Sequence, residues 1–271
     1  MYWEELTSRE FEKARKTTKG TCIIPFGVIE KHGTHLPLNT DMLVGRKVVS
    51  EVVKIEPAVI FPYYYFGQIA EAMHCPGTIS IEPELAYALL KNVCKEIARN
   101  GFKKIIILNS HGGNIRFIDY FIQTAIYEKK DYVIYGVSAL LNPKELMEIR
   151  TIYNCDKVGG HGGNHETSIV MLERPDLVHM DCIEEEGLKN YGRINHISRE
   201  MGIHTAMWWY ADHPTHFSGV VENSSAEAGE KACRLITERV AELVRAIKED
   251  TIAKQLQDEF FAKSETLGSR D

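Results

Sequence analysis

The sequence predicts an α/β fold: a three-layer α/β/α sandwich with a mainly parallel central sheet. Short runs rich in Ile and Val alternate with longer segments whose apolar residues recur at helical spacing. Gly or Pro separates one kind of segment from the other. Repeated β-α units of this kind build a parallel sheet that is covered by helices on both faces. No repeat or linker argues for a second domain, so we expect residues 1–271 to form a single domain.

The elements of the first half follow from local signals. Thr7 and Glu10 have capping-box spacing and open a first helix. Residues 21–27 read as a buried strand that ends in a glycine turn, and a helix follows from Asp41 to about residue 55. After Pro83, pairs of apolar residues predict an amphipathic helix that stops at residues 100–101.

Further elements continue the alternation. We expect strands at 58–61, 104–108 and 132–137, and helices at 115–127, 143–149, 165–173 and 232–247. The long loop 62–80 is a candidate functional segment. Residues 176–224 lack clear periodicity, and their aromatic residues suggest that they line or cover a pocket.

Composition disfavours several classes of partner. The 32 basic and 38 acidic residues give a net charge of -6 without a basic stripe, so we expect no nucleic acid partner. The strongest aliphatic run, residues 105–108, is too short to cross a bilayer, and the charged N-terminal segment disfavours secretion. The six cysteines include no Cys-x-x-Cys pair and are expected to be reduced. We therefore expect a cytoplasmic protein with no membrane partner.

Three short segments concentrate carboxylates and imidazoles. One lies just past the strand predicted at 21–27, the second follows the strand predicted at 104–108, and the third is the glycine-rich stretch 160–166. Loops that leave the carboxyl ends of parallel strands meet at one edge of a sheet, so we expect the segments to lie together. The candidate residues are Glu30, His32, Asp41, His111, His161 and Glu166.

Carboxylate and neutral imidazole suit zinc, manganese or ferrous iron. None of these segments contains a cysteine, which argues against a site with thiolate ligands. A single zinc held by three residues is one arrangement. Five candidate ligands, Glu30, His32, Asp41, His111 and Glu166, exceed what one catalytic ion needs and fit two ions that share a carboxylate. Two such ions hold a hydroxide and polarise a substrate carbonyl, so we expect a metal-dependent hydrolase.

The adjacent glycine pairs have two interpretations. Gly112-Gly113 and Gly162-Gly163 either let the backbone approach a ligand closely, with positive φ, or only form tight turns. Taken singly, His32 or His111 is more often a structural histidine than a ligand. Three such segments in a βα layout make coincidence hard to sustain.

These segments resemble the creatininase (creatinine amidohydrolase) family. The resemblance is carried by Pro25-Phe26-Gly27-Val28-Ile29-Glu30-Lys31-His32-Gly33-Thr34-His35-Leu36-Pro37-Leu38-Asn39-Thr40-Asp41, by Pro76 to Ser80, and by residues 109–114 and 161–168. It runs in the same order from about residue 5 to about residue 245. It implies an α/β/α domain with two divalent metal ions (Zn, Mn or Fe). The implied reaction is hydrolysis of a carbon–nitrogen bond in an amide, cyclic amide or formamide through a metal-bridging hydroxide. The implied partners are a small-molecule substrate and further copies of the chain in a homo-oligomer, typically a hexamer.

The resemblance also assigns roles position by position. Asp41 resembles the bridging ligand, Glu166 the remaining acidic ligand or its close neighbour, and His161 the proton-transfer residue. Glu30, His32 and His111 resemble the other metal ligands. His161 and Glu166 are the expected catalytic residues.

The chain departs from the family pattern in ways that bear on its substrate. Creatininases proper carry an acidic ligand two residues after the histidine that matches His111, where this chain has Gly113, so Glu166 completes the site. They also carry tryptophans shortly before the histidine matching His161, and residues 137–160 contain none, which argues against creatinine. Lys31 and Thr34 replace the usual Gln and Pro and reshape the pocket or point into solvent.

Other interpretations stay open. The same centre suits a hydrolase that opens a keto-sugar or inositol-derived ring at a carbon–carbon bond, and a catalytically silent metal-binding scaffold would keep the same ligands. Trp208, Trp209 and Tyr210 form a pocket wall, a subunit contact or part of the core. His213 and His216 either contact substrate or occupy a loop surface, and the surface is favoured because nothing pairs them with a second ligand cluster.

Overall fold

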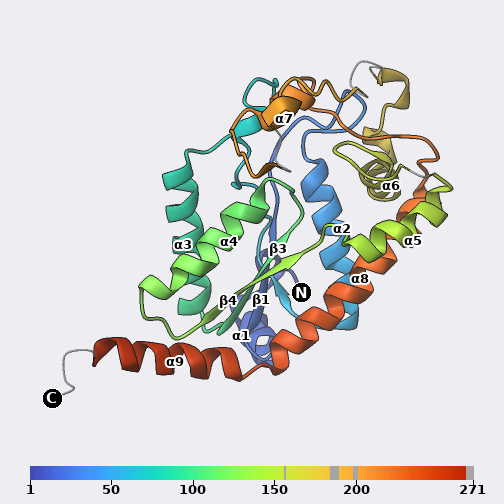
Figure 1. Cartoon of the computed structure of the whole chain (residues 1–271). Coiled ribbons are helices and arrows are strands. Elements are labelled where there is room, and N and C mark those ends of the chain that lie inside the picture. The colour runs from blue at the N-terminus through green and yellow to red at the C-terminus, as the bar shows by residue number, and fades with distance from the viewer. Residues whose placement is uncertain (156, 184–188, 198–200, 267–271) are drawn as a thin grey trace.

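A four-stranded, all-parallel sheet lies at the centre of the protein, with strand order β2-β1-β3-β4 (Figure 1). The coordinates are a computed structural model that describes residues 1–155, 157–183, 189–197 and 201–266. The central strands β1 (Thr21–Phe26) and β3 (Lys104–Asn109) are almost wholly buried, as expected for parallel strands covered on both faces. The edge strands are β2 (Val59–Ile60) and β4 (Val133–Ser138).

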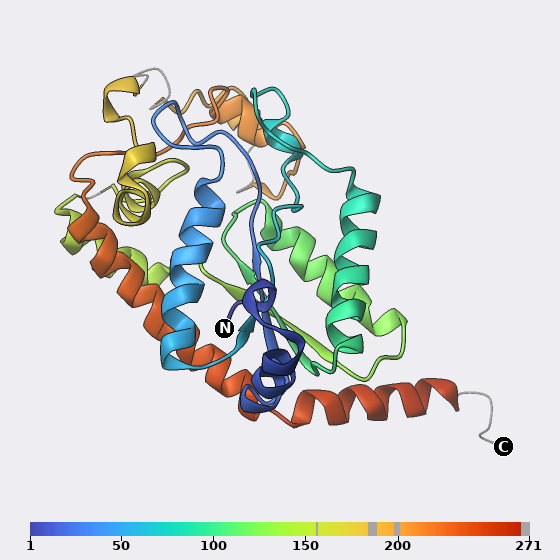
Figure 2. The same cartoon turned by 180° about the vertical axis from the view of Figure 1, so that it is seen from behind.

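Helices cover both faces of the sheet, which confirms the predicted three-layer class (Figures 1 and 2). On one face α2 (Thr40–Ile55), α6 (Asn164–Glu173) and α8 (Ala226–Glu249) bury a cluster around Ile23 and Ile106. On the other, α3 (Pro83–Arg99) and α4 (Asn114–Thr124) pack on residues of opposite parity in the same strands, such as Ile24 and Ile107. Alternate side chains of each strand therefore pack into two separate hydrophobic cores, one on each face of the sheet.

Most predicted elements appear close to their expected bounds. Helix α1 (Ser8–Thr17) begins with the capping box of Thr7 and Glu10. Helix α5 (Pro143–Tyr153) is longer than expected and carries a second capping box, and α7 (Trp208–Asp212) is a short helix in the aperiodic stretch. The predicted helix 115–127 is α4 followed by a 3-10 turn at Ala125–Tyr127.

Three expectations about elements need correction. Strand β2 has two residues instead of four, because it is an edge strand enclosed by Pro57 and Pro62. Helix α8 starts at Ala226, where the Ser225 side chain caps the N–H of Ala228. Helix α9 (Ile252–Glu265) was not predicted, because its few apolar residues are mostly exposed and its pattern is weak.

The carboxyl ends of β1 and β3 open toward the same edge, which lies below α7 in Figure 1. The Ser110 N–H donates to the Phe26 carbonyl, so the chain leaves both strands side by side. All six cysteines are free, and four of them are buried. Among the described residues, no helix combines the length and apolarity that a bilayer span requires.

Candidate metal centre

Glu30, Asp41 and His111 meet at the carboxyl edge of the sheet. His111 Nδ1 lies 2.7 Å from Glu30 Oε1 and 3.0 Å from Asp41 Oδ2, and all three side chains are buried. Neither carboxylate oxygen has an aligned hydrogen-bond donor among the described residues. Buried carboxylate oxygens without donors are costly in an ordinary core, whereas an ion would satisfy them. This oxygen and nitrogen donor set fits a divalent zinc, manganese or iron ion.

A second group of ligand atoms lies on the other side of Asp41. His32 Nε2 is 3.2 Å from Asp41 Oδ1 and 3.9 Å from Glu166 Oε2, and His161 completes a compact set with His32 and Glu166. One oxygen of Asp41 therefore faces His111 and the other faces His32. A carboxylate that bridges two ions requires this placement.

Local structure holds these side chains in place. The Asn109 side chain accepts from the His111 N–H and donates to the His111 carbonyl, which fixes the turn after β3. Asp41 lies in the first turn of α2, where the helix dipole favours a carboxylate. The Gly162 N–H donates to Glu166 Oε2 over 2.7 Å.

The charges at the site show that it attracts cations. Burial opposes protonation of His32, but Asp41, Glu166 and Glu30 together outweigh burial and raise the pKa of His32 to about 9. Burial likewise opposes protonation of His111, yet Glu30 and Asp41 raise the pKa of His111 well above its usual value. Burial raises the pKa of the Glu166 carboxyl to about 7. Protons and divalent ions therefore compete for the same donor atoms.

His161 lies beside the ligand clusters on the pocket wall. Its Nε2–H donates to the Lys31 carbonyl over 2.6 Å, and its ring centroid is 4.1 Å from that of His32. Burial, and then the charge of His32, lower the pKa of His161 well below its usual value. The ring is therefore neutral, with Nε2 carrying the hydrogen.

The backbone around His161 is closely packed against residues 218–219. A Cβ at Gly160, which has φ of +83°, would lie 2.1 Å from the Ser218 carbonyl oxygen, and a Cβ at Gly219 would lie 2.3 Å from the Gly163 Cα. The Ser218 N–H also donates to the His161 carbonyl. Glycine at these positions allows two backbone segments to touch, and this contact fixes the loop that carries His161.

The pair Gly112-Gly113 matters for the space that it leaves beside His111, and not for a positive φ. Gly112 and Gly113 both lack positive φ, so that part of the expectation is wrong for this pair. A Cβ at Gly113 would lie 2.5 Å from His111 Nε2 and 2.6 Å from Glu71 Oε1, whereas a Cβ at Gly112 would meet nothing within 4 Å. Gly113 therefore makes room for the Glu71 carboxylate, which also accepts a hydrogen bond from Gln68.

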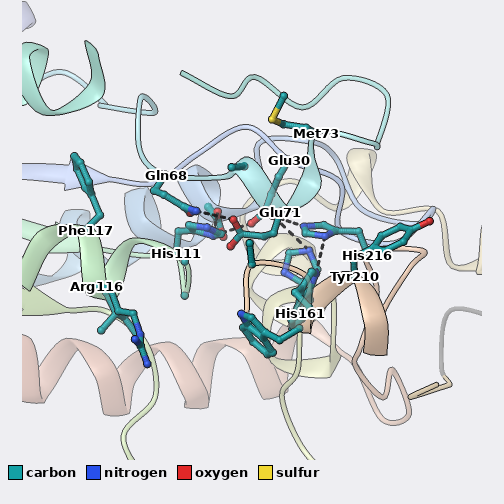
Figure 3. Close-up of a pocket in the computed structure, with 18 of the residues that line it drawn as sticks. Glu30, Gln68, Glu71, Met73, His111, Arg116, Phe117, His161, Tyr210 and His216 are labelled. Carbon is teal, nitrogen blue, oxygen red and sulfur yellow. Dashed lines mark hydrogen bonds and ion pairs between the residues drawn. The ribbon is translucent and has the colours of Figure 1, made fainter. Parts of the chain in front are cut away.

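A cavity of about 1070 Å³ opens from the ligand clusters. Figure 3 shows Arg116 and Phe117 on one side of this pocket and Met73 and Tyr210 on the other. The pocket wall includes Trp208, Trp209 and Tyr210, which is one of the three positions that the sequence left open for them. None of the three belongs to a hydrophobic core cluster of the described residues. Glu71 and Arg116 are charged residues of the wall that sequence reasoning did not single out.

His216 corrects an expectation. The sequence favoured a loop surface, but the side chain is 1% exposed and its Nε2 lies 2.5 Å from Glu30 Oε2 (Figure 3). No spacing signal connects two residues 186 positions apart, so the sequence had no means of finding this contact. His213 is only partly buried and packs against the ring of Trp209.

Comparisons with known proteins identify related sequences and structures. The sequence profile described as "Creatininase: Creatinine amidohydrolase" matches residues 4–244. The creatinine amidohydrolase of Pseudomonas putida is 29% identical over 66% of this chain and 74% of its own. The 3-dehydro-scyllo-inosose hydrolase of Thermotoga maritima is 24% identical over 92% of this chain and 84% of its own. The solved structure "Creatininase Mn" superposes with a TM-score of 0.76 at 22% identity, covering 92% of this chain and 99% of that one.

Proposed function

We propose how this chain works from the premise that it belongs to the creatininase family and is a hydrolase of carbon–nitrogen bonds. The observation that carries the proposal is the position of Asp41, whose two oxygens face two different groups of ligand atoms beside a large pocket. A single ion would leave one of these groups unused. The proposed substrate bond is the amide of a linear amide, a cyclic amide or a formamide.

In this proposal each ion has three protein ligands. Glu30, Asp41 and His111 would hold one, and His32, Asp41 and Glu166 would hold the other. When bound, the ions would lower the pKa of a water so that it attacks as hydroxide, and they would polarise the scissile carbonyl. Three protein ligands per ion leave coordination positions open, as a catalytic site needs.

His161 moves the proton in this proposal. Its Nε2–H is held by the Lys31 carbonyl, which leaves Nδ1 as the nitrogen that accepts a proton and then passes it to the leaving nitrogen. It lies on the pocket wall next to both ligand groups, so one ring reaches the nucleophile and the leaving group.

The proposal also covers the identity of the metal, the cellular location and the oligomeric state. The donor set favours Zn, Mn or Fe(II), and the free cysteines suit a cytoplasmic location. A homo-oligomer, with a hexamer as the family precedent, agrees with the exposed apolar residues Ile252, Leu256 and Phe260, which recur every four residues along α9.

A second candidate reaction is the opening of a keto-sugar or inositol-derived ring. It is favoured by the inosose hydrolase, which matches almost the whole of this chain. The two reactions need the same ions but different pocket walls. A panel of lactams, formamides and cyclic ketoses, assayed with Mn, Zn and Fe(II), separates them.

Two variants test the proposed roles directly. We expect Asp41→Ala to lose bound metal, because both ions share this side chain, and His161→Ala to keep the metal and lose turnover. Metal is measured by elemental analysis and turnover with the substrate panel. Full metal content in Asp41→Ala would refute the bridging role, and full turnover in His161→Ala would refute the proton transfer.

A further inference from the structure

The second oxygen of Glu30 is held by a residue from a distant part of the chain. Glu30 Oε1 faces His111, while Oε2 lies 2.5 Å from Nε2 of His216. Both side chains are fully enclosed, with His216 1% exposed and Glu30 0%. The two oxygens of this carboxylate therefore have different neighbours.

The chemistry of Trp209 fixes the direction of that hydrogen bond. The indole Nε1–H of Trp209 donates to His216 Nδ1 over 2.7 Å. An indole nitrogen is a donor only, so Nδ1 of His216 must accept and the neutral ring carries its hydrogen on Nε2. His216 therefore donates to Glu30, and Trp209 determines which nitrogen does so.

The backbone of His216 indicates that this arrangement is imposed by its surroundings. Its φ is +54°, in the left-handed region that non-glycine residues seldom adopt and that persists where neighbouring contacts fix it. The His216 N–H donates to the His213 carbonyl, and the His74 ring bonds to the Pro214 carbonyl. A strained turn, pinned at two points, directs one imidazole at one carboxylate oxygen.

We propose that His216 and Trp209 are positioning residues for the metal centre. His216 holds Oε2 of Glu30 so that Oε1 points at the ion, and Trp209 holds His216 in the tautomer that donates. The inference rests on the proposed function, because it takes Glu30 as a metal ligand. Hydrogen-bond partners of ligating carboxylates set ligand orientation and affinity without touching the ion.

The proposal connects the substrate wall to the metal centre. Trp209 belongs to α7, whose Trp208 and Tyr210 also line the pocket. One short helix thus forms part of the surface that meets the substrate and supports a ligand of the ion behind it.

Three variants of the full-length chain test this inference. His216→Asn keeps a residue that tolerates positive φ but has an amide too short to reach Glu30. His216→Gln places an amide N–H near the position of Nε2. Trp209→Phe removes the indole N–H and keeps a smaller aromatic ring. Trp3→Phe, in the N-terminal aromatic cluster, is the control for loss of an indole.

Affinity for Zn²⁺ and Mn²⁺ is measured by competition with a chelator, and the number of ions at saturation by elemental analysis. We expect His216→Asn to weaken binding about 10- to 100-fold, with His216→Gln recovering part of the loss. Trp209→Phe should weaken binding less, and in the double variant with His216→Asn it should add no further loss, because both act through one contact. All variants should still bind the wild-type number of ions at saturation.

Several results would overturn the inference. Wild-type affinity in His216→Asn would show that the contact does not position Glu30. Fewer ions at saturation would make His216 a ligand itself, and an additive double variant would separate Trp209 from His216. A wild-type chain that binds neither ion would instead refute the proposed function, so the two failures are distinguishable.

Discussion

The adjacent glycines after β3 offer a test in which neighbouring positions should behave differently. In Gly113→Ala the new Cβ would lie 2.5 Å from His111 Nε2, whereas in Gly112→Ala it would meet nothing within 4 Å. Carbon and nitrogen atoms pack at about 3.5 Å, so the His111 ring must retreat by roughly 1 Å. The Asn109 side chain holds the backbone of His111 and prevents the turn from absorbing this shift.

The shift determines the size of the effect. Functional side chains must stay within about 0.5 Å of their productive positions, so a ligand displaced by roughly twice that distance binds poorly. We expect Gly113→Ala to weaken metal binding about 10- to 100-fold, equivalent to about 1.4 to 2.8 kcal/mol, and Gly112→Ala to change it little.

The assay is chelator competition on both variants at one pH, with the melting temperature as a check that each folds. A Gly113→Ala protein that binds metal as tightly as Gly112→Ala would refute the reasoning. It would mean that Glu71 and His111 move apart without cost, and that Gly113 serves only the turn.

Three further predictions follow from burial and close packing. Burial lowers the pKa of His35 to about 4 from 6.5, so the folded state excludes the proton that the unfolded chain binds. His35 alone should therefore lower the free energy of unfolding by about 2 to 3 kcal/mol as the pH falls from 6.5 to 4, and the pH dependence measured by urea unfolding should be weaker by this amount in His35→Gln. Gly229→Ala should lower stability by about 2 kcal/mol, because its Cβ would lie 2.2 Å from the Ser168 carbonyl oxygen between α6 and α8. Helix propensity alone predicts a gain of about 1 kcal/mol, so a higher melting temperature would contradict the packing argument. Gly160→Ala should reduce turnover with the substrate panel at least 10-fold by displacing His161, and unchanged turnover would show that the loop adapts.

The fold was predictable because its signals are local. Pro83 at the start of α3 and Asn100 after its end enclose a strong amphipathic pattern, and β1 and β3 are short β-branched runs next to glycine turns. The candidate ligands were found for a related reason, since they directly follow strands whose ends must meet at one edge. The short β2 and the unpredicted α9 show the opposite case, where few buried apolar residues leave little pattern.

The missed residues depend on how distant loops pass the site. Glu71 is significant only because Gly113 leaves space opposite it, and His216 only because a positive-φ turn brings it to Glu30. Neither contact leaves a periodic trace in the sequence. The space beside Gly113 and the turn at His216 are tertiary features, and only coordinates reveal them.

The close backbone contact between residues 160–163 and 218–219 tolerates substitution much less than other parts of the pocket wall do. Insertion of even one methyl group into this backbone crossing separates the loops that carry His161 and His216. Two exposed residues that line the pocket, Met73 at 69% exposure and Ile115 at 48%, carry no such constraint. Directed evolution of new substrate preferences should therefore succeed with libraries at Met73 and Ile115 and yield mostly inactive clones at the glycine crossing.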